Sequence, residues 1–360
     1  MKKKIKIATV YISRPIKKFE AVTMDTVRWL KISEALAKLG YQVDMVTNEA
    51  SQKIIQMAPN LRRVPYNKIN WRDYQVVKTL FPEGFCSLEK AGGANHPFII
   101  SKTTVVGRKN EPGVYFKGWT RWRLFSILRR INQKARYITI LSQPSKKLWE
   151  KEFGIKKNIL LVPTGVDKII PPPKKNPYKK FKEKIVLFAG NIGNCQQRKV
   201  NLRWQNKLNS MGSLLKQKGI RLCFVGSGDM GKLDFNSVTY MGSVSNKFFW
   251  DYQYFADCGI VFAEGEPQNF EMSKIYYYLR TGLPVVSESP IPNNNVILKA
   301  NLGFIAPYDN DQKMTDLIEK AIYQKWNKKK AIDYILKNHT WDKRVEIYDQ
   351  IIKKEFSSSG

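Results

Sequence analysis

The chain has 360 residues, of which 43% are hydrophobic and 26% charged, so it is long enough for two globular domains and too apolar to be disordered throughout. Its 62 Lys and Arg residues against 30 Asp and Glu give a formal net charge of +32. Such a charge attracts nucleic acid, anionic lipid or phosphorylated substrates, and a general enrichment in lysine explains it equally well. The four cysteines show no CxxC spacing, which argues against a disulfide scaffold or a structural zinc site and suits a reducing compartment.

The chain starts with a basic and then an apolar stretch. This is not the pattern of a signal peptide, because Lys6 interrupts a short apolar run. No segment has the ~18 apolar residues of a membrane span, so we expect a cytoplasmic protein. The pattern predicts a buried strand over 5–12, a helix over 22–39 that Gly40 ends, and a strand over 42–47. Strand, helix and strand form a βαβ unit, which builds parallel sheets.

The same alternation continues along both halves of the chain, although much of 60–120 has no clear pattern. In the first half we expect strands over 76–81, 98–101, 137–141 and 158–162, and helices over 122–135 and 145–153. In the second half we expect strands over 184–189, 220–225, 238–241, 259–263 and 284–287, and helices over 200–218, 246–256, 272–281, 311–326 and 342–355.

A segment rich in Pro and Lys, 168–183, separates the halves and is interpreted as a linker between domains. The predicted fold is therefore α/β, with two Rossmann-like domains over 1–167 and 184–338 and a last helix within 339–356. Ligands of open α/β sheets bind at the carboxyl ends of the strands, so two such domains are expected to face a cleft that holds the ligand.

Two glycine-rich segments follow predicted strands in the second half. Gly226–Gly231 matches G-x-G-x-x-G, but the next strand is predicted from Val238, which leaves no room for the helix of a nicotinamide-binding fold. A tight turn or a loop that lines a cleft fits better. The segment 189–199 is rich in Gly and amides and ends in Arg198 and Lys199, a composition that suits phosphate binding, with a solvated loop as the alternative.

The segment 269–288 is the most informative one. Ser273 and Lys274 at a predicted helix start suit a diphosphate, whereas the three tyrosines that follow fit a helix packed in the core. Asp309 and Asp311 form a D-x-D that can hold a divalent ion on a nucleotide. Asp311 also precedes a predicted helix as a natural N-cap, and we expect no metal.

Histidine occurs only twice, at His96 and His339. His339 comes just before the last helix, where capping explains it. His96 lies in a Gly-rich loop next to a predicted strand, and we expect this loop to face the cleft. There the imidazole would bind a phosphate or a sugar hydroxyl, or take a proton. The alternative is that His96 only fills space in the loop. No Ser/His/Asp series, HExxH or GxxxxGK[ST] motif is present, which argues against hydrolase, zinc-protease and P-loop functions.

Several segments in one order resemble glycosyltransferases of family-4 type with the GT-B fold, which act in bacterial polysaccharide synthesis. They are 161–167, 186–190, 222–228, 238–242, 273–286, 301–304 and 339–344, and they cover roughly residues 160–350. The resemblance implies transfer of a sugar from a nucleotide-sugar, such as a UDP- or GDP-sugar, to a saccharide or lipid-linked acceptor. It also implies no metal or cofactor, retention of anomeric configuration, and a C-terminal helix that crosses back to the first domain.

The resemblance assigns roles to residues of the donor site. Cations would stabilise the charge of the leaving diphosphate, and glycines would allow close approach of the backbone. These residues are Arg198, Lys199 and Lys274, with Gly190 and Asn191. The paired strands that end in Gly226 and Gly228 would present the nucleotide base near Gly242 and Val244. Asn269, Glu271 and Ser273 would lie near sugar or ribose hydroxyls, with Glu271 a catalytic candidate. An inverting reaction would need a base from the first domain, His96 or Asp25.

The chain departs from the family after its first strand, where residues 13–16 replace the Gly-Gly turn of many members, and at two positions of the donor site, where Tyr277 is still expected to bind the donor. Asn269 and Tyr277 stand where members often have two glutamates, so a GT-B-like protein that binds a sugar or a partner without catalysis stays an alternative. The second alternative is a basic nucleic-acid-binding protein, but RRM, KH and zinc-finger signatures are absent and no nucleic-acid partner is expected.

The predicted helix over 122–135 and the residues before it are basic and aromatic. The residues concerned are Arg121, Arg123, Arg129, Arg130 and Lys134, interleaved with Trp119, Trp122 and Phe125. Such a face can hold a protein on an anionic membrane, where a lipid-linked acceptor is found. We would then expect this protein to be a peripheral membrane protein at the inner face of the plasma membrane. A solvated basic helix is the alternative interpretation.

Overall fold

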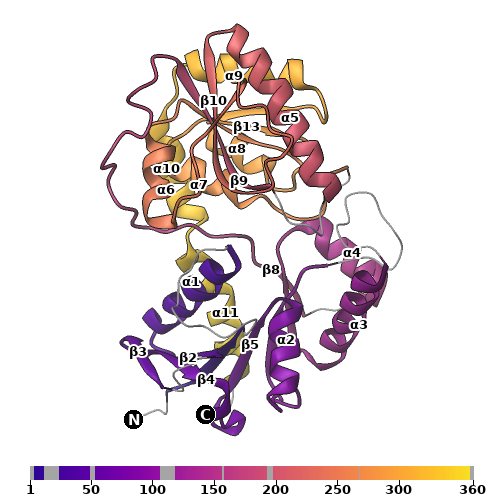
Figure 1. Ribbon diagram of the computed structural model, residues 1–360. Coiled ribbons are helices and arrows are strands. Elements are labelled where there is room, and N and C mark those ends of the chain that lie inside the picture. Colours follow the sequence, from indigo (N-terminus) through magenta and orange to yellow (C-terminus); the bar gives the residue numbers. More distant parts are fainter. Residues whose placement is uncertain are drawn as a thin grey trace. The chain divides into compact units, whose positions relative to one another are not determined.

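The computed structural model describes residues 4–11, 24–48, 53–105, 118–155, 158–192, 198–266 and 268–356, with the backbone alone for 118, 198–201 and 246–247. The chain forms two compact units (Figure 1). Unit 1 holds the described residues before Val166 and those from Trp341 onward, and unit 2 is the stretch Val166–Thr340. Within the described ranges, no helix has the length and apolarity that a membrane span requires.

Unit 1 is built on a sheet of eight strands in the order β3-β4-β2-β1-β5-β6-β7-β8. All neighbouring pairs are parallel except β3 with β4. The strands are β1 (Lys6–Val10), β2 (Gln42–Thr47), β3 (Ile55–Ala58), β4 (Leu61–Pro65), β5 (Val76–Leu80), β6 (Ile99–Lys102), β7 (Tyr137–Ile140) and β8 (Ile159–Leu161). The strand order reverses between β1 and β5, which makes this the topological switch point of the sheet.

The helices of unit 1 come from both ends of the chain. They are α1 (Met24–Lys38), α2 (Phe81–Lys90), α3 (Gly118–Lys134), α4 (Gln143–Phe153) and α11 (Trp341–Phe356), with short 3-10 turns at Tyr66–Lys68 and Trp71–Asp73. Figure 1 shows α11 beside α1, and both bury apolar side chains in one core with β1, β2 and β5. The C-terminal helix therefore crosses back to the first half of the chain, as predicted.

Unit 2 has a parallel sheet of six strands in the order β11-β10-β9-β12-β13-β14. The strands are β9 (Lys184–Ile192), β10 (Ile220–Gly228), β11 (Val238–Tyr240), β12 (Cys258–Val261), β13 (Val285–Glu288) and β14 (Gly303–Ala306). The helices are α5 (Arg198–Gln217), α6 (Asn246–Tyr254), α7 (Ser273–Arg280), α8 (Asn294–Ala300), α9 (Asp311–Tyr323) and α10 (Lys328–Asn338). Two Rossmann-like α/β halves were predicted, and the structure confirms them.

The Pro/Lys segment 168–183 belongs to unit 2. It is anchored there by Tyr178, whose buried ring packs edge-on against Tyr252 at 5.8 Å and whose hydroxyl donates to the Tyr252 carbonyl at 3.1 Å. The backbone N–H of Lys174 also donates to Asp251 at 2.8 Å. Prolines and lysines indicated a segment without packing, but a single aromatic side chain is enough to dock it.

Candidate functional site

Three glycines lie together at the carboxyl edge of the unit 2 sheet. The register of β9 with β10 places Gly190 beside Gly226, and a Cβ on Gly226 would lie 1.6 Å from the Gly190 carbonyl oxygen. The Gly226 N–H donates to the Gly242 carbonyl at 3.0 Å, and the Tyr240 hydroxyl donates to the Gly226 carbonyl at 2.9 Å. Only glycine fits at 226, so the ends of β9 and β10 and the residue after β11 form a close backbone floor.

Lys274, the second residue of α7, reaches over this floor. Its Nζ lies 2.7 Å from the point that a Cβ on Gly190 would occupy. The ammonium also lies over the rings of Phe188 and Trp204, 4.8 and 5.0 Å from their centroids. The absence of a side chain at Gly190 thus makes room for a cation at the carboxyl ends of the strands, where ligands of such sheets bind.

A carboxylate accompanies this lysine. Glu264 follows β12, and burial raises its pKa while Lys274 opposes that rise. Burial likewise lowers the pKa of Lys274, and the charge of Glu264 opposes that fall. The charges of Glu264 and Lys274 thus act on each other, and mutually perturbed groups of this kind are typical of functional sites. Glu264 was not among the site residues predicted from the sequence; its position just after a buried strand was the available signal.

Two buried amides fix the loop between β12 and α7. The Gln268 side chain accepts from the Glu264 N–H at 2.8 Å and donates to the Phe270 carbonyl at 2.8 Å. Asn293 accepts from the Met272 N–H and donates to the Met272 carbonyl, both at 3.0 Å. These bonds hold the start of α7, and hence Lys274, in place. Neither amide was predicted, because isolated Gln and Asn residues in loops follow no pattern.

The face of α7 that carries Lys274 is aligned by Tyr278. Its hydroxyl accepts from the Ala189 N–H at 3.1 Å, and its ring fills the space where Gly259 has no side chain. Because residues four apart share a helix face, Tyr278 and Lys274 both point toward β9.

The other two tyrosines of α7 pack elsewhere. Tyr277 is only 9% exposed, and its ring stacks on Trp250 at 5.5 Å. The Tyr276 hydroxyl donates to Glu271 at 2.9 Å, and its ring lies 5.1 Å from that of His339. The ring of Tyr277 therefore packs on α6, and the Glu271 carboxylate is bound by Tyr276.

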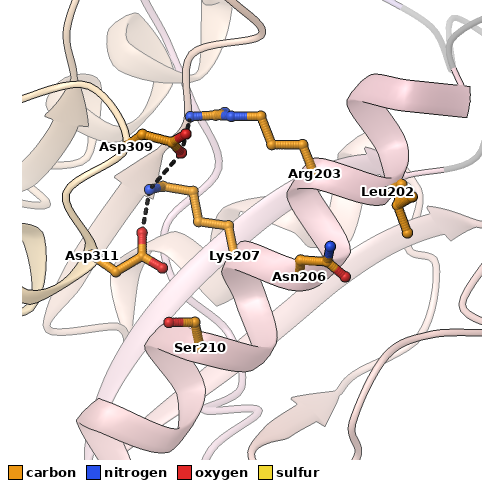
Figure 2. Close-up of a pocket in the computed structure, with 7 residues that line it drawn as sticks. All are labelled: Leu202, Arg203, Asn206, Lys207, Ser210, Asp309 and Asp311. Atoms are coloured by element: carbon orange, nitrogen blue, oxygen red, sulfur yellow. Dashed lines mark hydrogen bonds and ion pairs between the residues drawn. The ribbon is translucent and has the colours of Figure 1, made fainter.

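A pocket of about 630 Å³ opens beside α5 (Figure 2). It is lined by Leu202, Arg203, Asn206, Lys207, Ser210, Asp309 and Asp311. Lys207 contacts Asp311 directly and lies 3.9 Å from Asp309 and 3.2 Å from the buried Glu288. Arg203 bonds to Asp309 at 3.0 Å, so each carboxylate of the D-x-D pair has its own cation partner. Over the described ranges, no cluster of three or more His, Cys, Asp or Glu could hold a metal ion.

Arg203 joins this network to the strand ends. It donates to the Ala263 carbonyl at 2.6 Å and to Glu288 at 2.8 Å, while Glu288 accepts from the N–H groups of Ala263 and Asp309 at 2.9 and 2.7 Å. The network fixes the segments that follow β12, β13 and β14 relative to α5. In the sequence, the sign of this network was Glu288, a carboxylate at the end of a buried strand.

The remaining predicted donor-site residues lie around the same edge. Arg198 and Lys199 begin α5, but their side chains, and the loop over 193–197, lie outside the described residues. Asn191 is exposed at the end of β9, Gly228 ends β10 and Ser273 begins α7. Val244 and Asn269 are half-buried in loops of unit 2.

Comparisons with known proteins bear on the fold. No family model and no curated protein matches the chain. Among solved structures, sucrose-phosphate synthase from Thermosynechococcus elongatus aligns over 99% of this chain and 100% of its own, with a TM-score of 0.75 and 13% identity. WaaG, a glycosyltransferase of lipopolysaccharide biosynthesis, aligns over 96% and 99%, with a TM-score of 0.63 and 15% identity. HepE from Anabaena, in complex with UDP, aligns over 99% and 100%, with a TM-score of 0.63 and 13% identity.

The chain has the GT-B fold. This is the fold that the order of its motifs predicted, and it was recovered at identities of 13 to 15%.

In the first unit of this GT-B fold, His96 is not where the sequence placed it. His96 precedes β6, and its imidazole bonds to Tyr74, which precedes β5. It therefore lies at the amino edge of the sheet. Its Nε2 is 2.9 Å from the Tyr74 carbonyl, and its Nδ1 accepts from the Phe98 N–H at 3.1 Å. The expectation that His96 faces the carboxyl-edge cleft is wrong, because a loop before a parallel strand lies at the opposite edge. Asp25, in the first turn of α1 after β1, is at the carboxyl edge.

The basic helix α3 keeps only part of the predicted face. Arg121 and Phe125 are buried, and Arg130 pairs with Glu89 at 2.9 Å. Trp119 and Trp122 are 72% and 62% exposed and stack on each other at 4.8 Å. Other exposed residues of this helix are Arg123, Arg129 and Lys134. The exposed tryptophan pair with these cations is called the α3 face below.

Proposed function

We propose that the chain is a glycosyltransferase that moves a sugar from a nucleotide-sugar, such as a UDP- or GDP-sugar, to a saccharide or lipid-linked acceptor. The observation that carries the proposal is Lys274, an ammonium held over Gly190 at the carboxyl edge of the unit 2 sheet. HepE, which has the same fold, was solved with UDP. In the proposed complex the diphosphate lies against the backbone of Gly190 and Gly226 and beside the first N–H groups of α7.

The chemistry follows from where charge develops. When the glycosidic bond to the diphosphate breaks, negative charge grows on the leaving group and the sugar becomes oxocarbenium-like. A preoriented ammonium and helix N–H groups stabilise that charge most where water is excluded. Lys274 would supply the charge without a metal, and Arg198 and Lys199 would add to it from the start of α5. Glu264 would keep Lys274 protonated in the empty site. Retention of configuration is proposed from the family resemblance.

The test is a thermal-shift screen with UDP, GDP, ADP, CMP and their common sugar conjugates, in a chelator. A ligand at about 100 times its Kd adds about 2.7 kcal/mol to the free energy of unfolding, so one nucleotide should raise Tm by several degrees. Lys274→Met should remove the shift, and Lys299→Met, which removes an exposed lysine of α8, should keep it. If no nucleotide shifts Tm, the proposal is wrong.

A second candidate is a GT-B-like protein that binds the nucleotide-sugar without turnover. It is favoured by Tyr277, which stands where family members often have a glutamate and packs on Trp250. The two functions differ in release of the nucleoside diphosphate. A transferase should release it from its donor when an acceptor is added, and slowly by hydrolysis without one. A binding protein should protect the donor indefinitely.

We also propose that the protein is cytoplasmic and that the α3 face contacts an anionic membrane, where a lipid-linked acceptor is accessible. The support is the exposed, stacked tryptophan pair beside the exposed cations Arg123 and Arg129, since aromatic rings enter the interface and cations attract anionic lipid. With no nucleic-acid partner expected from the sequence, an anionic lipid surface is the partner that we propose for this face.

A further inference from the structure

Two lysines are buried inside the first unit. Lys78 in the middle of β5 and Lys102 at the end of β6 are each 1% exposed. The register pairs Lys78 with Ile100 and Leu80 with Lys102, so both lysine side chains leave the sheet on the same face. That face is the one covered by α1 and α11, since the Lys78 ammonium lies 4.9 Å from the ring centroid of Tyr348 in α11.

Neither ammonium has a hydrogen-bond partner within the part of the chain that the structure describes. The Nζ of Lys102 lies 3.2 Å from the ring centroid of Phe81, and the Nζ of Lys78 lies farther, 4.9 Å, from the ring centroid of Tyr348. A buried charge without hydrogen bonds is strongly disfavoured, and buried charges in proteins are normally paired or bound to a ligand. Two such groups together therefore require an explanation from function.

Further cations surround the pair. Arg28 of α1 is buried, donates to the Thr164 hydroxyl, and acts electrostatically on both lysines. Arg344 of α11, also buried, donates to the Thr164 carbonyl at 3.0 Å. On the acidic side, the half-buried Asp25 of α1 and the exposed Glu83 of α2 act on Lys102. The balance stays positive, and in the empty protein burial lowers the pKa of Lys78 to about 7 and lowers that of Lys102 as well.

The position of the pair is also that of a ligand site. Lys78 lies on β5, beside the switch point between β1 and β5, and Lys102 ends its strand at the carboxyl edge. Phe81, whose ring covers Lys102, has a φ of 58°, a left-handed conformation that is unfavourable for a bulky residue. Backbone strain of this kind is concentrated at functional sites. The strained residue also begins α2, whose positive end therefore lies at the same edge.

We propose that the carboxyl edge of the unit 1 sheet binds a phosphate group of the acceptor substrate, held by Lys78 and Lys102 with Arg28 as a third cation. That the phosphate belongs to an acceptor rests on the proposed function. A phosphate dianion fits better than a carboxylate, because with both lysines protonated in the complex the three cations, offset by the one nearby half-buried carboxylate, carry two positive charges. Its oxygens accept several hydrogen bonds and would supply the partners that both ammonium groups lack.

The test measures binding of inorganic phosphate and glucose 6-phosphate to the full chain by calorimetry, with glucose as the neutral control. Lys102→Met should weaken phosphate binding by at least about tenfold, as should Lys78→Met. Lys90→Met removes an exposed lysine from the last turn of α2 and should have no effect. Because methionine has a similar length and no charge, both buried variants should keep or raise Tm.

Lys274→Met separates this inference from the proposed function. Phosphate binding that survives Lys274→Met and is lost in Lys102→Met supports the site in unit 1. The reverse pattern places the phosphate in unit 2 and overturns the inference while leaving the donor site intact. A Lys102→Met variant that lowers Tm but binds phosphate normally also overturns it, since the lysine would then serve only its contact with Phe81.

A parallel titration with dioctanoyl phosphatidic acid distinguishes the source of the phosphate. Tighter binding than glucose 6-phosphate, lost in Lys102→Met, identifies a lipid-linked acceptor. The opposite order identifies a sugar phosphate, and binding of neither compound overturns the inference.

Discussion

Gly190 shows how a residue without a side chain can determine a binding site. Its missing Cβ leaves the space into which the Lys274 ammonium extends. We predict that Gly190→Ala folds, because the only close atoms to the added methyl are at the flexible end of a lysine, 2.7 Å from Nζ and 3.0 Å from Cε, while Phe188 lies at an ordinary 3.9 Å. The ammonium must move, and the affinity for the nucleotide found by thermal shift should fall by about tenfold or more.

The matched control is Gly231→Ala, which adds a methyl to another glycine of unit 2 where the nearest atom is the Asp229 carboxylate at 3.2 Å. Its nucleotide affinity, measured by calorimetry, should equal that of the unchanged protein. An unchanged affinity in Gly190→Ala would show that Lys274 does not contact the nucleotide.

The electrostatic influence of Glu264 on Lys274 leads to a prediction about pH. Burial lowers the pKa of Lys274 and Glu264 counteracts it, so Glu264→Gln should lower that pKa further. Binding that needs the protonated lysine is present below its pKa and is lost as pH rises through it. The affinity for nucleotide should therefore decline at lower pH in Glu264→Gln than in the unchanged protein, and the two should agree in acid, where Glu264 is itself neutral. Coinciding pH profiles from titrations between pH 6 and 9 would contradict this.

At the scale of elements, strongly patterned segments were predictable and weakly patterned ones were not. The first βαβ unit and the strands of unit 2 could be predicted from apolar runs bounded by glycine. By contrast, α2 begins at Phe81 without a side-chain cap, and α10 begins in a run of lysines, capped by Asn327. Lys274 and Gly190 were predicted for the site because helix starts and glycines after strands have a known use. The buried Lys78 and Lys102 were not, since their meeting depends on the strand order of the folded sheet.

The α3 face leads to a prediction about lipid. The double variant Trp119→Ser/Trp122→Ser should reduce sedimentation of the protein with phosphatidylglycerol vesicles at least several-fold, because the rings supply the apolar contact and the cations the attraction. Added salt should weaken what binding is left, and phosphatidylcholine vesicles should bind little. Tyr66→Ser is the matched control, an exposed aromatic of the same unit. Equal sedimentation of the double variant and the control would rule out the α3 face as the membrane contact.

At the scale of the whole molecule, the chain leaves unit 1 after Gly165 and returns at Trp341. The two ends of unit 2 are joined to each other, since the Val166 N–H donates to the His339 carbonyl at 2.9 Å. In unit 1, Gly165 lies against the ring of Trp341, where a Cβ would come within 2.7 Å. The two crossings of the chain therefore lie side by side, and unit 1 depends on a helix that is distant in sequence.

This dependence predicts how unit 1 responds to a cavity in α11. Ile352 is buried in the core that α11 shares with α1, and Ile352→Ala should lower the free energy of unfolding of unit 1 by about 2–4 kcal/mol. Gln350→Ala, at an exposed position of the same helix, should have little effect. Urea unfolding followed by hydrogen exchange checks this: protection should fall in β1, β2 and β5 and stay unchanged in unit 2. An equal loss of protection in both units would contradict the division of the chain.

The return of α11 to unit 1 also sets the order in which the protein is made. Residues 166–340 leave the ribosome as one continuous stretch, so unit 2 has its whole sequence before α11 exists. At roughly 5–20 residues per second, synthesis of that stretch takes about 10–35 seconds. During this time the apolar side of α1 has no partner helix. We therefore expect the first half of the chain to finish folding after unit 2, with its uncovered apolar surface open to chaperones in the meantime.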